Sequence, residues 1–89
     1  MQLYLPVMDI RIDIETKGPS DVVHVSGRLV EYSIQQLTDV CEPMAGAFVL
    51  DLSNLVFADD ASVDAIRSLR EKGVDIQGAS TFIKLLIDG

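Results

Sequence analysis

The residues best suited to chemistry or binding gather between positions 49 and 63, where Asp59 and Asp60 stand close to the hydroxyl of Ser62. Two carboxylates with Asp51, Asp64 or Ser62 could coordinate Mg²⁺, but Mg²⁺ sites in proteins usually add substrate phosphates. The sequence has no glycine-rich phosphate-binding loop. Aspartate also caps helices, because its carboxylate accepts unpaired N–H groups of the first turn. We therefore expect no metal here, and at least one helix cap.

The sequence contains one histidine and one cysteine, which limits its other chemistry. A single cysteine forms neither an intrachain disulfide nor a cysteine-based zinc site. His24 lies between two valines and no nucleophile pattern accompanies it, so we expect a sheet residue rather than a catalyst. Cys41 falls on an apolar helical stripe, where free cysteine behaves as a small buried hydrophobe. We assign no catalytic residue and no cofactor, and the sequence does not predict an enzyme.

Composition narrows the class further. The chain has 89 residues, enough for one domain, with 14 acidic and 7 basic residues and a net charge of -7. This charge argues against nucleic acid or an anionic membrane as partner, because both are bound through Lys and Arg. Hydrophobic residues make up 48% of the chain, too many for intrinsic disorder. No run approaches the roughly 18 apolar residues of a membrane span, and with so little cysteine we expect a cytoplasmic protein without membrane insertion.

The first half of the chain predicts a hairpin and a helix. Residues 8–16 alternate apolar and charged side chains and residues 22–26 form a second strand, with turn formers between them. Apolar residues then recur at helical spacing from position 30 to 44. Ser33 and Gln36 suggest a capping box for this helix. Pro43 disfavours helical geometry at Glu42 and predicts the end of the helix there.

The second half predicts two more strands and two helices. Residues 47–52 read as a central strand covered on both faces, followed by a polar turn at Ser53 and Asn54 and an apolar ledge at 55–57. A helix is expected over 61–72, ended by Gly73, then a strand at 74–77 and a last helix capped by Ser80. The order β-β-α-β-α-β-α predicts an α/β domain, with a mixed sheet of about four strands covered by three helices, mainly on one face.

Four short segments, in this order, match a known pattern. They are Gly27-Arg28-Leu29 after the second strand, Leu50-Asp51-Leu52-Ser53 in the third, residues 57–63 at the acidic turn, and residues 78–86 at the last loop and helix. Together they resemble the STAS domain, the fold of bacterial anti-sigma factor antagonists, over residues 8–88. The expected organisation is an apolar N-terminal extension at 1–7 and a STAS-like domain at 8–89. The extension would pack on the domain or pair with a second copy, so a homodimer is an open alternative.

The resemblance breaks at the turn where family members are switched by phosphorylation. The accepting Ser or Thr of the family corresponds to Ala61, which has no hydroxyl, and the glycine that follows corresponds to Ser62. Three explanations stand in order of preference: a binder free of kinase control, a built-in negative charge at Asp60, and a phosphosite shifted to Ser62. A carboxylate imitates phosphate only in part, since a phosphate carries about −1.5 to −2 charges. We expect Ser62 to be unphosphorylated.

The resemblance implies a protein-interaction module of signalling and transcription regulation. The partner in the family is an anti-sigma factor of the GHKL-type kinase class, whose capture releases a sigma factor. Partner-binding residues would be Asp59, Asp60, Ala61, Ser62 and Val63, with an interface rim at Ser53, Asn54, Asp64 and Arg67. Two alternatives stay open: an accessory subunit that regulates an ABC transporter ATPase, and a small-ligand or nucleotide sensor, which a cavity beneath Phe57 would favour.

Overall fold

The computed structural model describes residues 10–44 and 47–89, so the expectations for residues 1–7 lie outside the described residues. Within those ranges the elements are β1 (Ile10–Lys17), β2 (Ser20–Leu29), α1 (Ile34–Cys41), β3 (Phe48–Ala58), α2 (Asp60–Glu71), β4 (Asp75–Gln77) and α3 (Thr81–Asp88), with single 3-10 turns at Glu31–Ser33 and Glu42–Met44. The order is the predicted one. No helix in the described part of the chain is long and apolar enough to cross a membrane.

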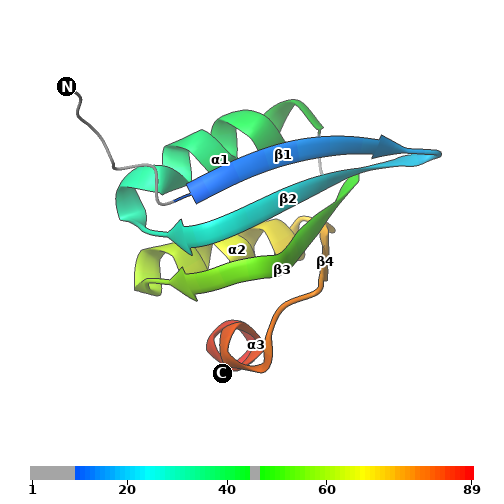
Figure 1. The fold of residues 1–89 in the computed structure, drawn as a ribbon. Helices are drawn as coiled ribbons and strands as arrows, with labels where there is room; N and C mark the ends of the chain where they lie inside the picture. Colours follow the sequence, from blue (N-terminus) through cyan, green and yellow to red (C-terminus); the bar gives the residue numbers. More distant parts are fainter. Residues whose placement is uncertain (1–9, 45–46) are drawn as a thin grey trace.

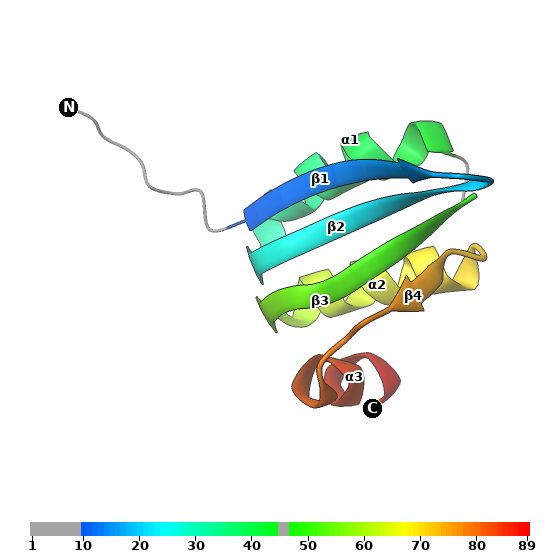
Figure 2. The same ribbon diagram turned by 45° about the vertical axis from the view of Figure 1, so that its right-hand side comes forward.

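The strands form one mixed sheet in the order β1-β2-β3-β4. β1 pairs antiparallel with β2 across a two-residue turn, while β2, β3 and β4 run parallel. Figures 1 and 2 show α1 and α2 behind the sheet, α3 beside its β4 edge, and no described helix in front. The expected α/β fold, with the helices mainly on one face, is confirmed. The open front face explains the charged side chains that alternate along β1.

The core lies between the sheet and the helices that pack against it. The central strands contribute fully buried side chains such as Val23 and Leu50, α2 adds Ile66 and α3 adds Ile83. Cys41 belongs to this core, and burial raises the pKa of its thiol to about 11. The interpretation of Cys41 as a small buried hydrophobe is therefore confirmed.

The polar turn expected at Ser53 and Asn54 is wrong, because β3 continues through it to Ala58. The pairing of β3 with β2 shifts register twice: His24 faces Asp51 but Ser26 faces Asn54, and Gly27 faces Leu55 but Arg28 faces Phe57. A β-bulge inserts an extra residue into one strand and breaks the alternation of side chains. Because of these two bulges, the sequence of one long strand has the pattern of a short strand, a turn and a separate apolar segment.

The capping box at Ser33 is also wrong. Ser33 has a helical backbone, is buried and makes no side-chain cap bond, because a 3-10 turn at Glu31–Ser33 precedes α1. A side-chain N-cap usually requires extended backbone at the capping residue. The other end signals hold: α1 ends at Cys41 before Pro43, and Ser80 caps α3 by accepting a hydrogen bond from the Ile83 N–H at 3.2 Å.

Candidate functional site

Asp59 joins the two loops that leave the carboxyl ends of β2 and β3. One carboxylate oxygen accepts the Ser62 N–H at 2.9 Å, and the other accepts the Glu31 N–H, also at 2.9 Å. The Asp59 N–H donates to the Leu29 carbonyl at 3.2 Å. The neighbouring Ser62 side chain, then the Ser62 and Glu31 N–H groups, lower the pKa of Asp59. The expected cap of α2 is confirmed, and it also fixes the end of β2.

The other residues of the acidic turn differ in their access to solvent. Asp60 is exposed in the first turn of α2, and Ala61 is half-buried. Ser62 and Val63 point into the core, with exposed fractions of 0% and 6%. Among the described residues, the Ser62 hydroxyl has no hydrogen-bond partner. Within residues 59–63, the turn therefore presents mainly the Asp60 carboxylate to solvent.

The structure divides the expected rim into two groups. Asp64 and Arg67 are neighbours on α2, with 3.7 Å between their charged groups. Arg67 also donates to the last carbonyls of α3, to Ile87 at 2.7 Å and Leu86 at 2.9 Å, so its guanidinium holds α3 against α2. Ser53 and Asn54 are exposed on β3. Whether these residues touch a partner remains a prediction.

Sequence reasoning missed an apolar and cationic surface at the same end of the sheet. Tyr32, in the turn after β2, is 70% exposed, and Val56 near the end of β3 is 66% exposed. The Arg28 guanidinium lies 4.9 Å from the centre of the Phe57 ring, a cation–π distance. Arg28 and Phe57 are register partners on β2 and β3, which the assumed end of β3 at residue 52 concealed. We call Arg28, Tyr32, Val56, Phe57 and Asp60 the loop-end surface.

The sequence also missed a polar network that crosses three strands. His24 on β2 shares hydrogen bonds with Glu15 on β1 at 2.8 Å and Asp51 on β3 at 2.7 Å. Ser53 donates its hydroxyl and its N–H to the other Asp51 oxygen. His24 is a mid-strand sheet residue, as expected. Both ring nitrogens face carboxylates and Ser53 bonds to Asp51 rather than to His24, so this is not an activated nucleophile.

This network predicts a pH-dependent stability. Hydrogen bonds to Glu15 and then Asp51 raise the pKa of His24 above 6.5, while hydrogen bonds from Ser53 contribute most to lowering the pKa of Asp51. The protonated imidazole can donate to both carboxylates, so the stabilisation is complete below pH 6.5 and disappears as pH rises through the folded pKa. Because the groups are partly exposed, we expect roughly 0.5–1 kcal/mol.

Urea denaturation of the wild type and of His24→Gln at pH 5.5 and pH 9 measures this effect. The free energy of unfolding of the wild type should exceed that of the variant at pH 5.5, and the difference between them should be smaller at pH 9. A gap that is equal at both pH values would contradict a protonated His24 in the network.

Two cavities of the described residues have linings that do not include Phe57. One, of about 470 Å³, lies between α1 and α2, and one of about 290 Å³ lies near β4 and α3.

No family model and no curated protein sequence matches this chain. Solved structures do resemble it. An anti-sigma factor antagonist STAS domain from Rhodobacter sphaeroides is 23% identical, with a TM-score of 0.67, covering 83% of this chain and 95% of its own. The chain has the fold of a STAS domain. The unphosphorylated anti-sigma factor antagonist SpoIIAA is 14% identical, with a TM-score of 0.64 and coverage of 88% and 78%. At these identities the likeness concerns the fold of the STAS-like domain.

Proposed function

We propose that this STAS-like domain is a regulatory protein-interaction module that acts as an anti-sigma factor antagonist. Its partner would be an anti-sigma factor of the GHKL-type kinase class, and both would be cytoplasmic. The observation that carries the proposal is the loop-end surface, where exposed Tyr32 and Val56 lie at the same sheet end as the Asp60 carboxylate. Interfaces are enriched in tyrosine and arginine, and exposed apolar residues gathered at one end of a fold mark interaction sites. The two structural neighbours are described as anti-sigma factor antagonists.

The proposed binder is free of phosphorylation at the acidic turn. Ala61 has no hydroxyl to accept a phosphate, and the Ser62 side chain is fully buried beneath the first turn of α2. A kinase could reach Ser62 only if that turn opened, which would break the cap made by Asp59.

We therefore predict that intact-mass analysis of the protein purified from its native cells finds no phosphate on Ser62. Dephosphorylated protein gives the reference mass, and Ser62→Ala gives a matched control for any phosphate elsewhere. A stoichiometric phosphate that is lost in Ser62→Ala would contradict a binder free of kinase control.

The partner itself can be tested by comparing captures from the native cell. Tagged wild type should recover a GHKL-type ATPase, and Tyr32→Ser combined with Asp60→Lys should recover at least 5-fold less of it, because interface energy is concentrated in a few residues. Asp39→Lys, an exposed acid on α1, is the matched control and should retain capture. Recovery of an ABC transporter ATPase instead, or capture that is insensitive to the double substitution, would contradict the proposal.

Asp60 also distinguishes a simple surface charge from a partial phosphate mimic. If the charge imitates phosphate and weakens the complex, Asp60→Ser should tighten binding of the captured partner in calorimetry. If it is only a first-turn acid of α2, the affinity should stay within about 2-fold, since exposed charges contribute little. Asp39→Ser, at an exposed acid of α1 outside the predicted interface, serves as the reference variant.

A further inference from the structure

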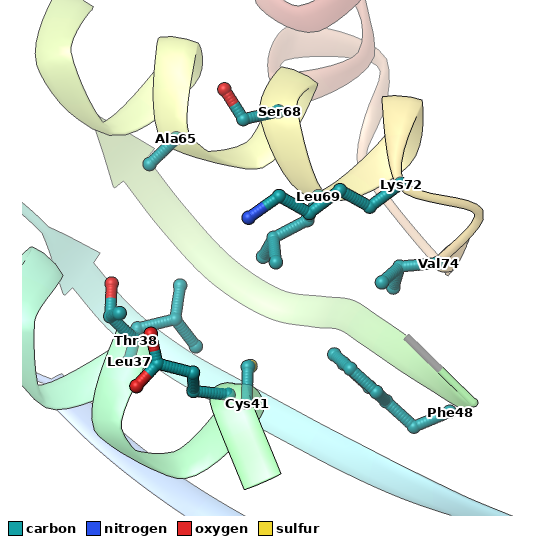
Figure 3. Close-up of a pocket in the computed structure, with 10 residues that line it drawn as sticks. Leu37, Thr38, Cys41, Phe48, Ala65, Ser68, Leu69, Lys72 and Val74 are labelled. Carbon is teal, nitrogen blue, oxygen red and sulfur yellow. The ribbon is translucent and has the colours of Figure 1, made fainter. Parts of the chain in front are cut away.

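The cavity of about 470 Å³ separates α1 from α2 at the end of the domain remote from the acidic turn. Figure 3 shows its lining, with Leu37 and Cys41 from α1 on one side, Leu69 from α2 on the opposite side, and Phe48 at the start of β3 beside Cys41. Leu37, Cys41 and Phe48 are between 2% and 4% exposed, so they form an apolar floor that water hardly reaches. Small-ligand sites are typically concave, mostly apolar and about 300–1,000 Å³ in volume.

Two opposite charges line the cavity, together with the hydroxyl residues Thr38 and Ser68 and the apolar side chains. Lys72 belongs to the α2 wall, and in Figure 3 its ammonium lies over Leu69. Glu42, the first residue of the 3-10 turn after α1, is the carboxylate among the lining residues. Among the described residues neither side chain forms an ion pair or a side-chain hydrogen bond, with the other or with any neighbour. Each charge is therefore available to a ligand.

This pair of charges selects the kind of ligand. An aliphatic carboxylate would be attracted by Lys72 but repelled by Glu42, and an aliphatic amine would meet the reverse. A molecule that carries both charges beside a hydrocarbon group meets neither repulsion. We propose that this cavity binds a free apolar α-amino acid, with its carboxylate facing Lys72, its ammonium facing Glu42 and its side chain over the apolar floor. This site is separate from the loop-end surface and does not depend on the proposed function.

Titration of the full chain with L-leucine and L-phenylalanine, followed by two-dimensional NMR, tests the proposal. Shifts should concentrate at Leu37, Leu69 and Val74, with saturation in the millimolar range, because the cavity is open and each exposed charge contact contributes only about 0.2–1 kcal/mol. L-Leucinamide lacks the carboxylate and N-acetyl-L-leucine lacks the ammonium, so each should bind about 2- to 5-fold more weakly. No saturable shifts in the cavity, or tighter binding of either derivative, would overturn the proposal.

Three variants assign the two charges and the space. Lys72→Gln should remove the advantage of leucine over leucinamide, and Glu42→Gln should remove its advantage over N-acetyl-leucine. Ala65→Leu, whose side chain would extend from the α2 wall shown in Figure 3, should abolish binding of all three ligands. Glu71→Gln, the preceding exposed position outside the lining, is the control and should bind like the wild type. Thermal unfolding of each variant confirms that it is folded. If leucine still binds more tightly than leucinamide in Lys72→Gln, and more tightly than N-acetyl-leucine in Glu42→Gln, the roles assigned to the two charges would be refuted.

Discussion

Replacing Asp59 with alanine is expected to lower the free energy of unfolding by about 2 kcal/mol, since a lost N-cap costs about 0.5–2 kcal/mol and a second bond to a charged acceptor disappears with it. The substitution leaves the N–H groups of Ser62 and Glu31 without their shared acceptor. Asp60→Ala is the matched control. Asp60 is exposed and its side chain makes no hydrogen bond or ion pair within the described residues, so its removal should change stability by no more than about 0.5 kcal/mol.

The pH dependence gives this comparison a second readout. The pKa of Asp59 is lowered in the folded state, so its stabilisation is complete above its unfolded pKa and is lost as pH falls through the folded value. The gap in unfolding free energy between wild type and Asp59→Ala should therefore be full at pH 7 and shrink as pH falls below about 4. Equal losses of stability from the Asp59 and Asp60 substitutions at pH 7 would show that the two hydrogen bonds accepted by the Asp59 carboxylate do not hold the two loops together.

The elements that the sequence predicts correctly are those marked by local signals. Asp59, Ser80 and Gly73 sit at helix ends, where capping or a left-handed turn depends on the residue itself and its near neighbours. The β-β-α-β-α-β-α order follows from these ends and from apolar periodicity. The length of β3 could not be read in this way, because its two bulges are defined only by pairing with β2. A local polar pair such as Ser53 and Asn54 looks the same in a bulged strand as in a turn.

In the candidate site, too, local sequence signals predict some features, while others depend on contacts between distant parts of the chain. Its position at the start of α2 follows from the acidic turn, but which side chains reach solvent depends on the helical phase. That phase buries Ser62 and Val63 and leaves Asp60 outside. The network around His24 joins residues that are 9 and 27 positions apart, and only the strand register brings them together. Arg67 likewise reaches carbonyls of α3 that lie 19 and 20 positions away.

Gly78→Ala should be more damaging than Gly73→Ala, although both glycines have a positive φ, of 75° and 100°. A Cβ at Gly73 would have open space around it, so this variant reports only the backbone cost, of about 1–2 kcal/mol. A Cβ at Gly78 would overlap the Ser53 hydroxyl and the Asp51 carboxylate. Those side chains can rotate away only by giving up the hydrogen bonds that connect them to each other and to His24. We therefore expect about 3 kcal/mol for Gly78→Ala, adding about 1–2 kcal/mol of lost hydrogen bonding to the backbone cost.

Chemical denaturation compares the two glycine variants, and NMR titration of His24 separates strain from damage to the network. If the Gly78 contact acts through Asp51, the pKa of His24 should fall back toward 6.5 in Gly78→Ala and stay raised in Gly73→Ala, because only the first variant displaces a hydrogen-bond partner of the imidazole. Equal losses of stability with an unchanged His24 titration would mean that the loop after β4 accommodates the methyl group without moving Asp51. A larger loss of stability in Gly78→Ala than in Gly73→Ala, together with the lowered pKa of His24, would place the β4–α3 connection in the same polar network that joins β1, β2 and β3.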